Sequence, residues 1–74
     1  MIEVDTKGMK CPMPMLRTKK ALAKIEPGEM LTVLATDPHA PKDLKQFCSQ
    51  TGNEYVEEKL EDGIYSILIK RKPA

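Results

Sequence analysis

Cys11 is the residue of this chain best suited to chemistry, because it opens the segment Cys11-Pro12-Met13-Pro14. A short strand is predicted over residues 2–5, a turn over 6–10, and a helix after the prolines. Proline is tolerated in a first helical turn, since the amide it lacks would have no intrahelical partner there. Cys11 would then lie just outside a helix start, where free amides and the positive end of the macrodipole favour thiolate over thiol.

Three basic residues strengthen the prediction of a reactive thiol at Cys11: Lys7, Lys10 and Arg17. We therefore expect its pKa to lie below the ordinary value of about 8.5. A thiolate in an exposed turn is a nucleophile or a sulfur carrier. The alternative is a structural cysteine in a plain turn. The basic flanks, the helix start and a second proline without an obvious packing role favour the reactive thiol.

Length and composition exclude several classes of protein. The 74 residues make one domain, predicted over 1–72 with a loose tail at 73–74, and leave no room to enclose a bulky organic cofactor. Because 12 basic residues nearly balance 11 acidic ones, no general attraction to nucleic acid or membrane is expected. The sequence has no leader-like start and no apolar run of about 18 residues, which predicts a cytoplasmic protein.

The second cysteine, Cys48, falls on a helical stripe with Leu44 and Phe47. This pattern predicts a small core residue rather than a redox partner of Cys11. With His39, the two cysteines give only three candidate metal ligands, without the usual spacing, where structural zinc takes four. No metal site is therefore predicted.

Hydrophobic periodicity predicts the element order βαβαββ. The remaining expected elements are a helix over 14–25, a strand over 30–36, a helix starting between 38 and 41 and ending at Gly52, and strands over 54–60 and 64–71. Asp37 is the expected N-cap of the second helix, and Asp62-Gly63 the hairpin turn. These elements predict an α/β (α+β) two-layer sandwich, a four-stranded mixed sheet with both helices on one face. The other face would be open and partly apolar.

The first helix has two distinct sides. Its expected apolar side consists of Met15, Thr18, Ala21, Leu22 and Ile25. Arg17, Lys20 and Lys24 follow one another down another side. Such a stripe is either a solvated surface or a docking surface for an acidic partner.

The string Asp5-x-x-Gly8-x-x-Cys11-Pro12-x-Pro14 resembles the signature of the TusA/SirA-like sulfur-carrier family. The resemblance extends over essentially the whole chain. Further matching segments are Gly28-Glu29-x-Leu31-x-Val33, Ala35-Thr36-Asp37-Pro38, Asp43, Phe47-Cys48, Gly52 and Ile69-Lys70-Arg71-Lys72.

The resemblance implies the two-layer fold and a Cys11 that accepts sulfane sulfur as a persulfide and relays it. Members of this family serve tRNA thiouridine synthesis, sulfur oxidation or selenium-related roles. Around the carrier cysteine we expect Asp5 to orient the turn through hydrogen bonds and Gly8 to adopt positive φ. The supporting and docking residues expected are Asp5, Gly8, Pro12 and Pro14 for the loop and helix start, and Lys10, Arg17 and Lys20 for partner docking.

So small a chain cannot hold a complete active site, so we expect a stoichiometric carrier rather than an enzyme. Its expected partners are protein sulfur donors, such as a cysteine desulfurase or a rhodanese-like protein, and protein acceptors that bind the monomer transiently. Two alternatives remain: a thiol-redox or peroxide-sensing module that uses Cys11 and Cys48, and a small regulatory RNA-binding module that uses the basic helix. The RNA-binding alternative lacks an aromatic platform on which bases could stack.

Overall fold

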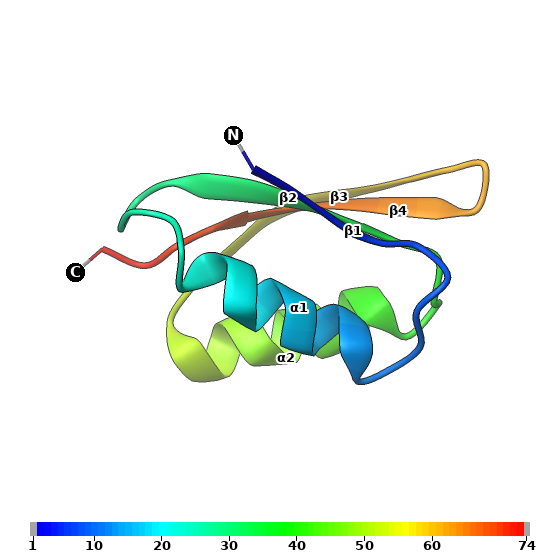
Figure 1. The fold of residues 1–74 in the computed structure, drawn as a ribbon, viewed down its shortest axis with the longest axis horizontal. Coiled ribbons are helices and arrows are strands. Elements are labelled where there is room, and N and C mark those ends of the chain that lie inside the picture. Colours follow the sequence, from blue (N-terminus) through cyan, green and yellow to red (C-terminus); the bar gives the residue numbers. More distant parts are fainter. Residues whose placement is uncertain (1, 74) are drawn as a thin grey trace.

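The computed structural model describes residues 2–73, which form a four-stranded sheet with two helices on one face (Figure 1). The elements are β1 (Ile2–Thr6), α1 (Met13–Leu22), β2 (Met30–Ala35), α2 (Ala40–Thr51), β3 (Glu54–Glu61) and β4 (Ile64–Lys70). The predicted βαβαββ order and two-layer architecture are confirmed. Of the predicted tail, Pro73 is exposed coil and residue 74 lies outside the described residues.

The order of the strands brings two loops together at one edge of the sheet. The strands lie side by side as β1-β2-β4-β3, with β1 and β2 parallel and the other pairs antiparallel. Thr6 at the end of β1 pairs with Ala35 at the end of β2. Because parallel strands end at the same edge, the β1–α1 and β2–α2 loops leave the sheet side by side.

The core lies between the sheet and the helices. Leu31 and Val33 of β2 and Ile67 and Ile69 of β4 are fully buried, and side chains on the alternate positions are not. This alternation is typical of a sheet with one covered face. The helices contribute Leu22, Leu44 and Cys48 to the same cluster, which confirms Cys48 as a core residue.

The boundaries of α1 differ from the prediction. The helix begins at Met13 and ends at Leu22, although Ile25 beyond its end is still buried. Pro14 is buried, so the second proline of the motif does have a packing role, contrary to expectation. Its lack of an amide hydrogen is harmless in the first turn of the helix.

The start of α2 at Ala40 lies within the predicted range, whereas its N-cap differs from the prediction. Its N-cap is His39, which makes no capping hydrogen bond through its side chain, so the assignment of Asp37 as N-cap was wrong. The helix ends at Thr51, and Gly52 is its C-cap, with φ of 83° as expected of a C-terminal glycine.

The sheet face away from the helices is partly apolar, as expected. Leu34 and Leu68 are half-buried there, beside the polar Thr32 and Ser66. The most exposed large apolar side chains belong to α1 and to strands β1, β2 and β3: Met13, Leu16, Ile2, Met30, Val56 and Leu60. Within residues 2–73, neither helix has the length and apolar character needed to span a bilayer.

Candidate functional site

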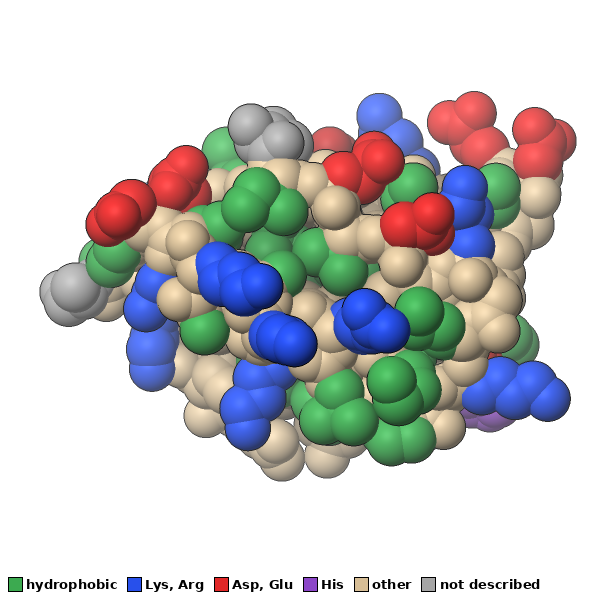
Figure 2. All heavy atoms as spheres, in the orientation of Figure 1, with side chains coloured by type: hydrophobic (Ala, Val, Ile, Leu, Met, Phe, Trp, Pro, Cys, Tyr) green, Lys and Arg blue, Asp and Glu red, His purple; other side chains and the backbone are tan. Residues whose placement is uncertain are grey.

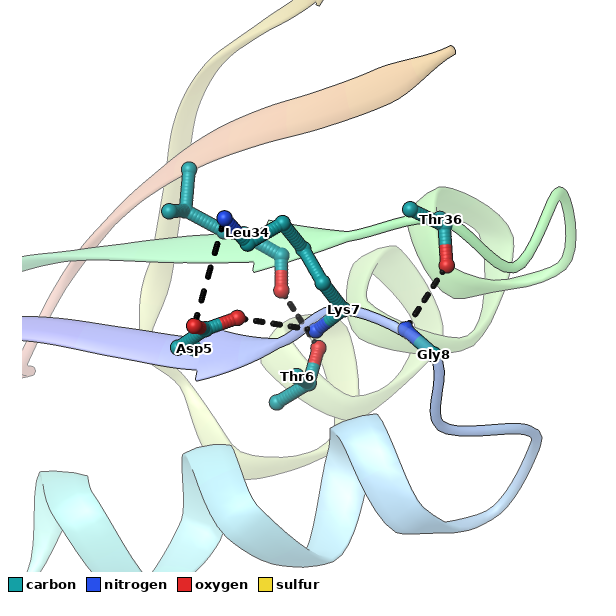
Figure 3. Close-up of polar contacts among 6 residues, drawn as sticks. All are labelled: Asp5, Thr6, Lys7, Gly8, Leu34 and Thr36. Atoms are coloured by element: carbon teal, nitrogen blue, oxygen red, sulfur yellow. Dashed lines mark hydrogen bonds and ion pairs between the residues drawn. The ribbon is translucent and has the colours of Figure 1, made fainter.

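The turn after β1 is held by hydrogen bonds to its own start and to the end of β2 (Figure 3). The Lys7 amide donates to the Asp5 carboxylate at 3.0 Å, and the Thr6 hydroxyl donates to the Leu34 carbonyl at 2.6 Å. The Gly8 amide donates to the Thr36 hydroxyl at 2.9 Å. Gly8 has φ of 81°, which confirms the positive φ expected there. Asp5 has the hydrogen-bonding role expected of it in the turn.

Asp37 ties Cys11 to the start of α2. One oxygen of its carboxylate accepts a hydrogen bond from the Cys11 amide at 2.8 Å. The other accepts from the His39 amide at 3.0 Å and lies 3.1 Å from the His39 Nδ1 atom. The Asp37 side chain is only 8% exposed, and these amide hydrogen bonds, from His39 first and Cys11 second, lower its pKa.

Cys11 is exposed and lies between two surface hollows. The larger, of about 510 Å³, is lined by the two loops at residues 8–11 and 36–39. The smaller, of about 270 Å³, lies between the start of α1 and one side of α2. Besides Cys11, it is lined by Pro12, Met15, Asp43, Gln46, Phe47 and Gln50. Pro12 is the N-cap of α1, and the Cys11–Pro12 peptide bond is cis.

The predicted lowering of the Cys11 pKa was wrong: its surroundings raise the pKa of the thiol. The largest cause is a hydrogen bond from the thiol to the Asp43 carboxylate, followed by partial loss of hydration and the negative charges of Asp43 and Asp37. Tertiary packing brings both carboxylates from the α2 side of the molecule to the sulfur. The nearby cations do not offset them, and the Lys7 ammonium is 4.0 Å from Asp5 instead.

Sequence analysis missed Asp43 as a neighbour of Cys11. It occupies the first turn of α2, where an acidic residue is explained by the helix dipole alone. One feature of the sequence could have indicated this neighbour. Asp43 precedes Phe47 by one helical turn, so both side chains lie on the same side of α2. Nothing local indicated that this side of α2 meets the β1–α1 loop.

The predicted docking residues do not all lie together. Lys10 lines the larger hollow beside Cys11. Arg17 and Lys20 line a separate hollow with Lys24 and the start of β1. Figure 2 shows basic side chains gathered over α1 on the side that faces the viewer. Met13 and Leu16 of the same helix are 40% and 44% exposed, so apolar surface adjoins the basic side chains near Cys11.

The second cysteine lies apart from this site. Cys48 is 2% exposed within the core, and burial raises the pKa of its thiol to about 11. Both cysteines are free. Among residues 2–73, no group of three His, Cys, Asp or Glu side chains could hold a metal ion.

Comparison with known proteins places the chain in a family. The family model described as "Sulfurtransferase TusA" matches residues 2–71. The chain belongs to the TusA family. This confirms the resemblance found in the sequence, and the match covers the strand, loop, helix and sheet residues that surround Cys11.

Relatives of the TusA family match the chain over nearly its whole length. The sulfur carrier protein TusA of Allochromatium vinosum is 48% identical over 69 residues, covering 93% of this chain and 91% of its own. The sulfur carrier protein TusA of Pseudomonas aeruginosa is 36% identical, covering 93% of this chain and 87% of its own. The crystal structure of the SirA-like protein of Desulfitobacterium hafniense matches with a TM-score of 0.86 and 32% identity. That match covers 97% of this chain and 99% of the other.

Proposed function

We propose that this protein is a sulfur carrier that accepts sulfane sulfur on Cys11 as a persulfide and passes it to a partner protein. The observation that carries the proposal is the exposure of Cys11 at the edge where two loops meet, with its amide fixed by Asp37. The other cysteine is buried in the core, so a single sulfur is accessible for transfer. Relatives in the same family are named sulfur carrier proteins.

Loading is a thiol–persulfide exchange that needs no external oxidant. The Cys11 thiolate attacks the terminal sulfur of a donor persulfide, and the sulfur–sulfur bond of the donor breaks. The donor leaves as a thiolate and takes up the proton that Cys11 lost. In the second transfer, a nucleophile of the acceptor attacks the terminal sulfur of the Cys11 persulfide, and Cys11 leaves as a thiolate. Each sulfur transfer therefore regenerates a thiol on the protein that gives the sulfur away.

The protein acts stoichiometrically in this proposal, because its partners supply the remaining chemistry. Cysteine desulfurases and rhodanese-like proteins carry persulfides and are the proposed class of donor. Lys10 beside the thiol, with Arg17 and Lys20 on α1, would meet acidic groups of a partner in a transient complex with the monomer. Met13 and Leu16 add apolar contact area close to Cys11. We place this exchange in the cytoplasm, where thiols stay reduced.

Intact-mass measurement tests the carrier proposal directly. The protein is incubated with inorganic polysulfide, or with a cysteine desulfurase and cysteine, and its mass is recorded before and after reduction. The proposal expects a gain of one sulfur that a reducing agent removes. Cys11→Ser should abolish this gain, and Cys48→Ser should retain it. A loss of two hydrogens would instead indicate a Cys11–Cys48 disulfide and the redox alternative, and equal loss of loading in both variants would contradict a single carrier cysteine.

A further inference from the structure

Strand β1 forms one edge of the sheet, so one side of its backbone has no neighbouring strand. In the order β1-β2-β4-β3, β2 lies on one side of β1, and residues 2–73 contain no strand on its other side. β1 pairs with β2 residue by residue from Ile2 to Thr6, a regular edge of about 17 Å. The amides and carbonyls that point outward from such an edge can pair with an added strand.

The opposite edge of the sheet, β3, is less suited to strand addition. Its pairing with β4 shifts register between Tyr55 and Glu57, and the strand carries four glutamates along its length. Bulges and charged side chains are features that keep an edge strand from pairing with another chain. β1 has only Glu3 and Asp5 as charged residues. Of the two edges, β1 is therefore the one that can accept a strand.

A groove of about 290 Å³ lies between β1 and α1. Its basic members are Arg17, Lys20 and Lys24, whose spacing of three and four residues places them on one side of α1 and of the turn after it. Its apolar members are Ile2 and Val4 of the strand and Ala21 of the helix. Figure 2 shows these two kinds of surface together, with basic side chains over α1 and apolar ones between them and the sheet. The edge strand and the basic side of α1 thus line the same groove.

We propose that a partner protein docks by adding an extended segment that contains glutamates to the free edge of β1. The inference rests on the proposed function, because it deepens the docking role of Arg17 and Lys20. The segment pairs its backbone with β1 and places every second side chain over α1. Glutamate suits those positions, since its methylene groups can pack on Val4 and Ala21 while its carboxylate meets a cation.

The two faces of the added strand would meet different charges. Val4 and Thr6 pair with the buried Val33 and Ala35, so these β1 side chains lie on the helix face of the sheet. The alternate residues Glu3 and Asp5 therefore lie on the open face. Acidic side chains of a partner on that face would be repelled by neighbouring carboxylates. The segment that fits best has glutamate at alternate positions and uncharged residues between them.

The groove also has a direction relative to Cys11. β1 ends at Thr6, where the loop that carries Cys11 begins, and α1 starts at Met13 directly after that loop. Because α1 connects two parallel strands, it runs back along β1, so the Arg17 end of the groove is the end closer to the loop. Cys11 does not line the groove. A segment bound there would hold a partner next to the thiol without covering it.

An NMR titration of the isotope-labelled protein tests the proposal without any sulfur chemistry. The probe is a synthetic peptide of about seven residues, enough to cover β1, in which glutamate alternates with threonine. We expect saturable binding with a dissociation constant of about 1 mM or tighter at low salt. Outward-pointing amides of residues 2–6 should exchange more slowly with solvent when the peptide is bound, whereas those of residues 54–61 should not.

Two control peptides separate strand addition from attraction between charges. A peptide of the same composition with its glutamates adjacent keeps the charge but loses the alternation. A peptide that is N-methylated throughout keeps the charges but lacks the amide donors that an added strand needs. Both should bind more weakly than the alternating peptide.

The matched protein variants all remove one exposed cation from α1. Arg17→Gln and Lys20→Gln should each weaken binding about two- to fivefold, as expected for exposed charge pairs. Lys19→Gln removes a cation from the same helix, but Lys19 lines a different hollow together with Phe47 and Arg71. Its affinity for the peptide should stay near that of wild type.

Several results would overturn the proposal. These are the absence of saturable binding, equal binding of the N-methylated peptide, slowed exchange in β3 instead of β1, and an equal loss of affinity in Lys19→Gln. A stable dimer that the peptide does not dissociate would also overturn it, since a second copy would then cover the edge. Loading with inorganic polysulfide is measured separately, because it needs no docking. A failure to gain sulfur would reject the carrier function and leave the peptide result standing, whereas normal loading without peptide binding would reject only the docking mode.

Discussion

The backbone amide of Cys11 donates a hydrogen bond of 2.8 Å to the carboxylate of Asp37, which lies 26 positions further along the chain. This bond joins the loop after β1 to the loop after β2. The parallel pairing of these strands, with Thr6 opposite Ala35, brings the two loops to one edge of the sheet. The position of Cys11 thus depends on a contact between two segments that are distant in sequence.

Replacing Asp37 by Asn should destabilise the fold in a pH-dependent way. Because its folded-state pKa is lowered, the carboxylate stabilises the fold fully above its ordinary pKa of about 3.9, and this contribution is lost as the pH falls through the lower folded pKa. Urea unfolding of wild type and Asp37→Asn should therefore give a constant difference at pH 5–7 that shrinks below about pH 4. Glu3→Gln, which removes an exposed carboxylate on β1, serves as control. A difference that stayed the same in acid would contradict the assignment.

Gly8→Ala should lower the free energy of unfolding by about 1 kcal/mol through backbone strain alone. A Cβ atom at Gly8 would meet no atom within 4 Å, and the residue has φ of +81°. Gly8→Asn should be less destabilising, because asparagine tolerates the left-handed region better than alanine. Chemical denaturation of the three proteins measures both effects. Equal stability of the alanine variant and wild type would show that the turn relaxes to negative φ.

Charge reversal at Arg17 and Lys20 should slow sulfur transfer from a protein donor, mainly through association. The effect should weaken as salt rises, because exposed charges are screened beyond about 10 Å at 0.1 M ionic strength. Loading by inorganic polysulfide should change much less, since no protein surface has to dock.

The matched control for this experiment is charge reversal at Lys59 and Lys72, both exposed and outside α1. It should leave the transfer rate near that of wild type. Equal losses with the protein donor and with polysulfide in the Arg17/Lys20 variant would mean that these residues affect the thiol or the fold rather than docking.

Cys48→Ser should lower the free energy of unfolding by ~1 kcal/mol or more, because it places a hydroxyl in an apolar core. Cys48→Ala removes the sulfur without adding a polar group, and it separates the effect of lost volume from that of the hydroxyl. The native Cys48 thiol, with a pKa raised to about 11, should resist alkylation at pH 8 until the protein unfolds. Rapid labelling of Cys48 in the folded protein would contradict its place in the core.

The sequence was sufficient for the order of the elements and for the assignment of Cys48 to the core. The alternation in β2 and β4 and the helical spacing of Leu44 and Cys48 are local patterns, and burial followed them closely. The positive φ of Gly8 and the turn made by Asp5 are also local, since each is decided by a few neighbouring residues. The motif around Cys11 is likewise a short, continuous stretch of chain, and its residue types and spacing suffice to indicate the family.

The tertiary structure decided the electrostatics of the site. In the sequence, the charged residues closest to Cys11 are mostly cations, which predicted a lowered pKa. In the folded protein Asp43 and Asp37 act on the thiol, and its pKa is raised instead. Tertiary packing also buries Pro14, and it places the Asp37 carboxylate on the Cys11 amide rather than at the cap of α2. Charge interactions and hydrogen bonds depend on distance in space, and that distance is fixed only when β1 and β2 pair and α2 packs beside the β1–α1 loop.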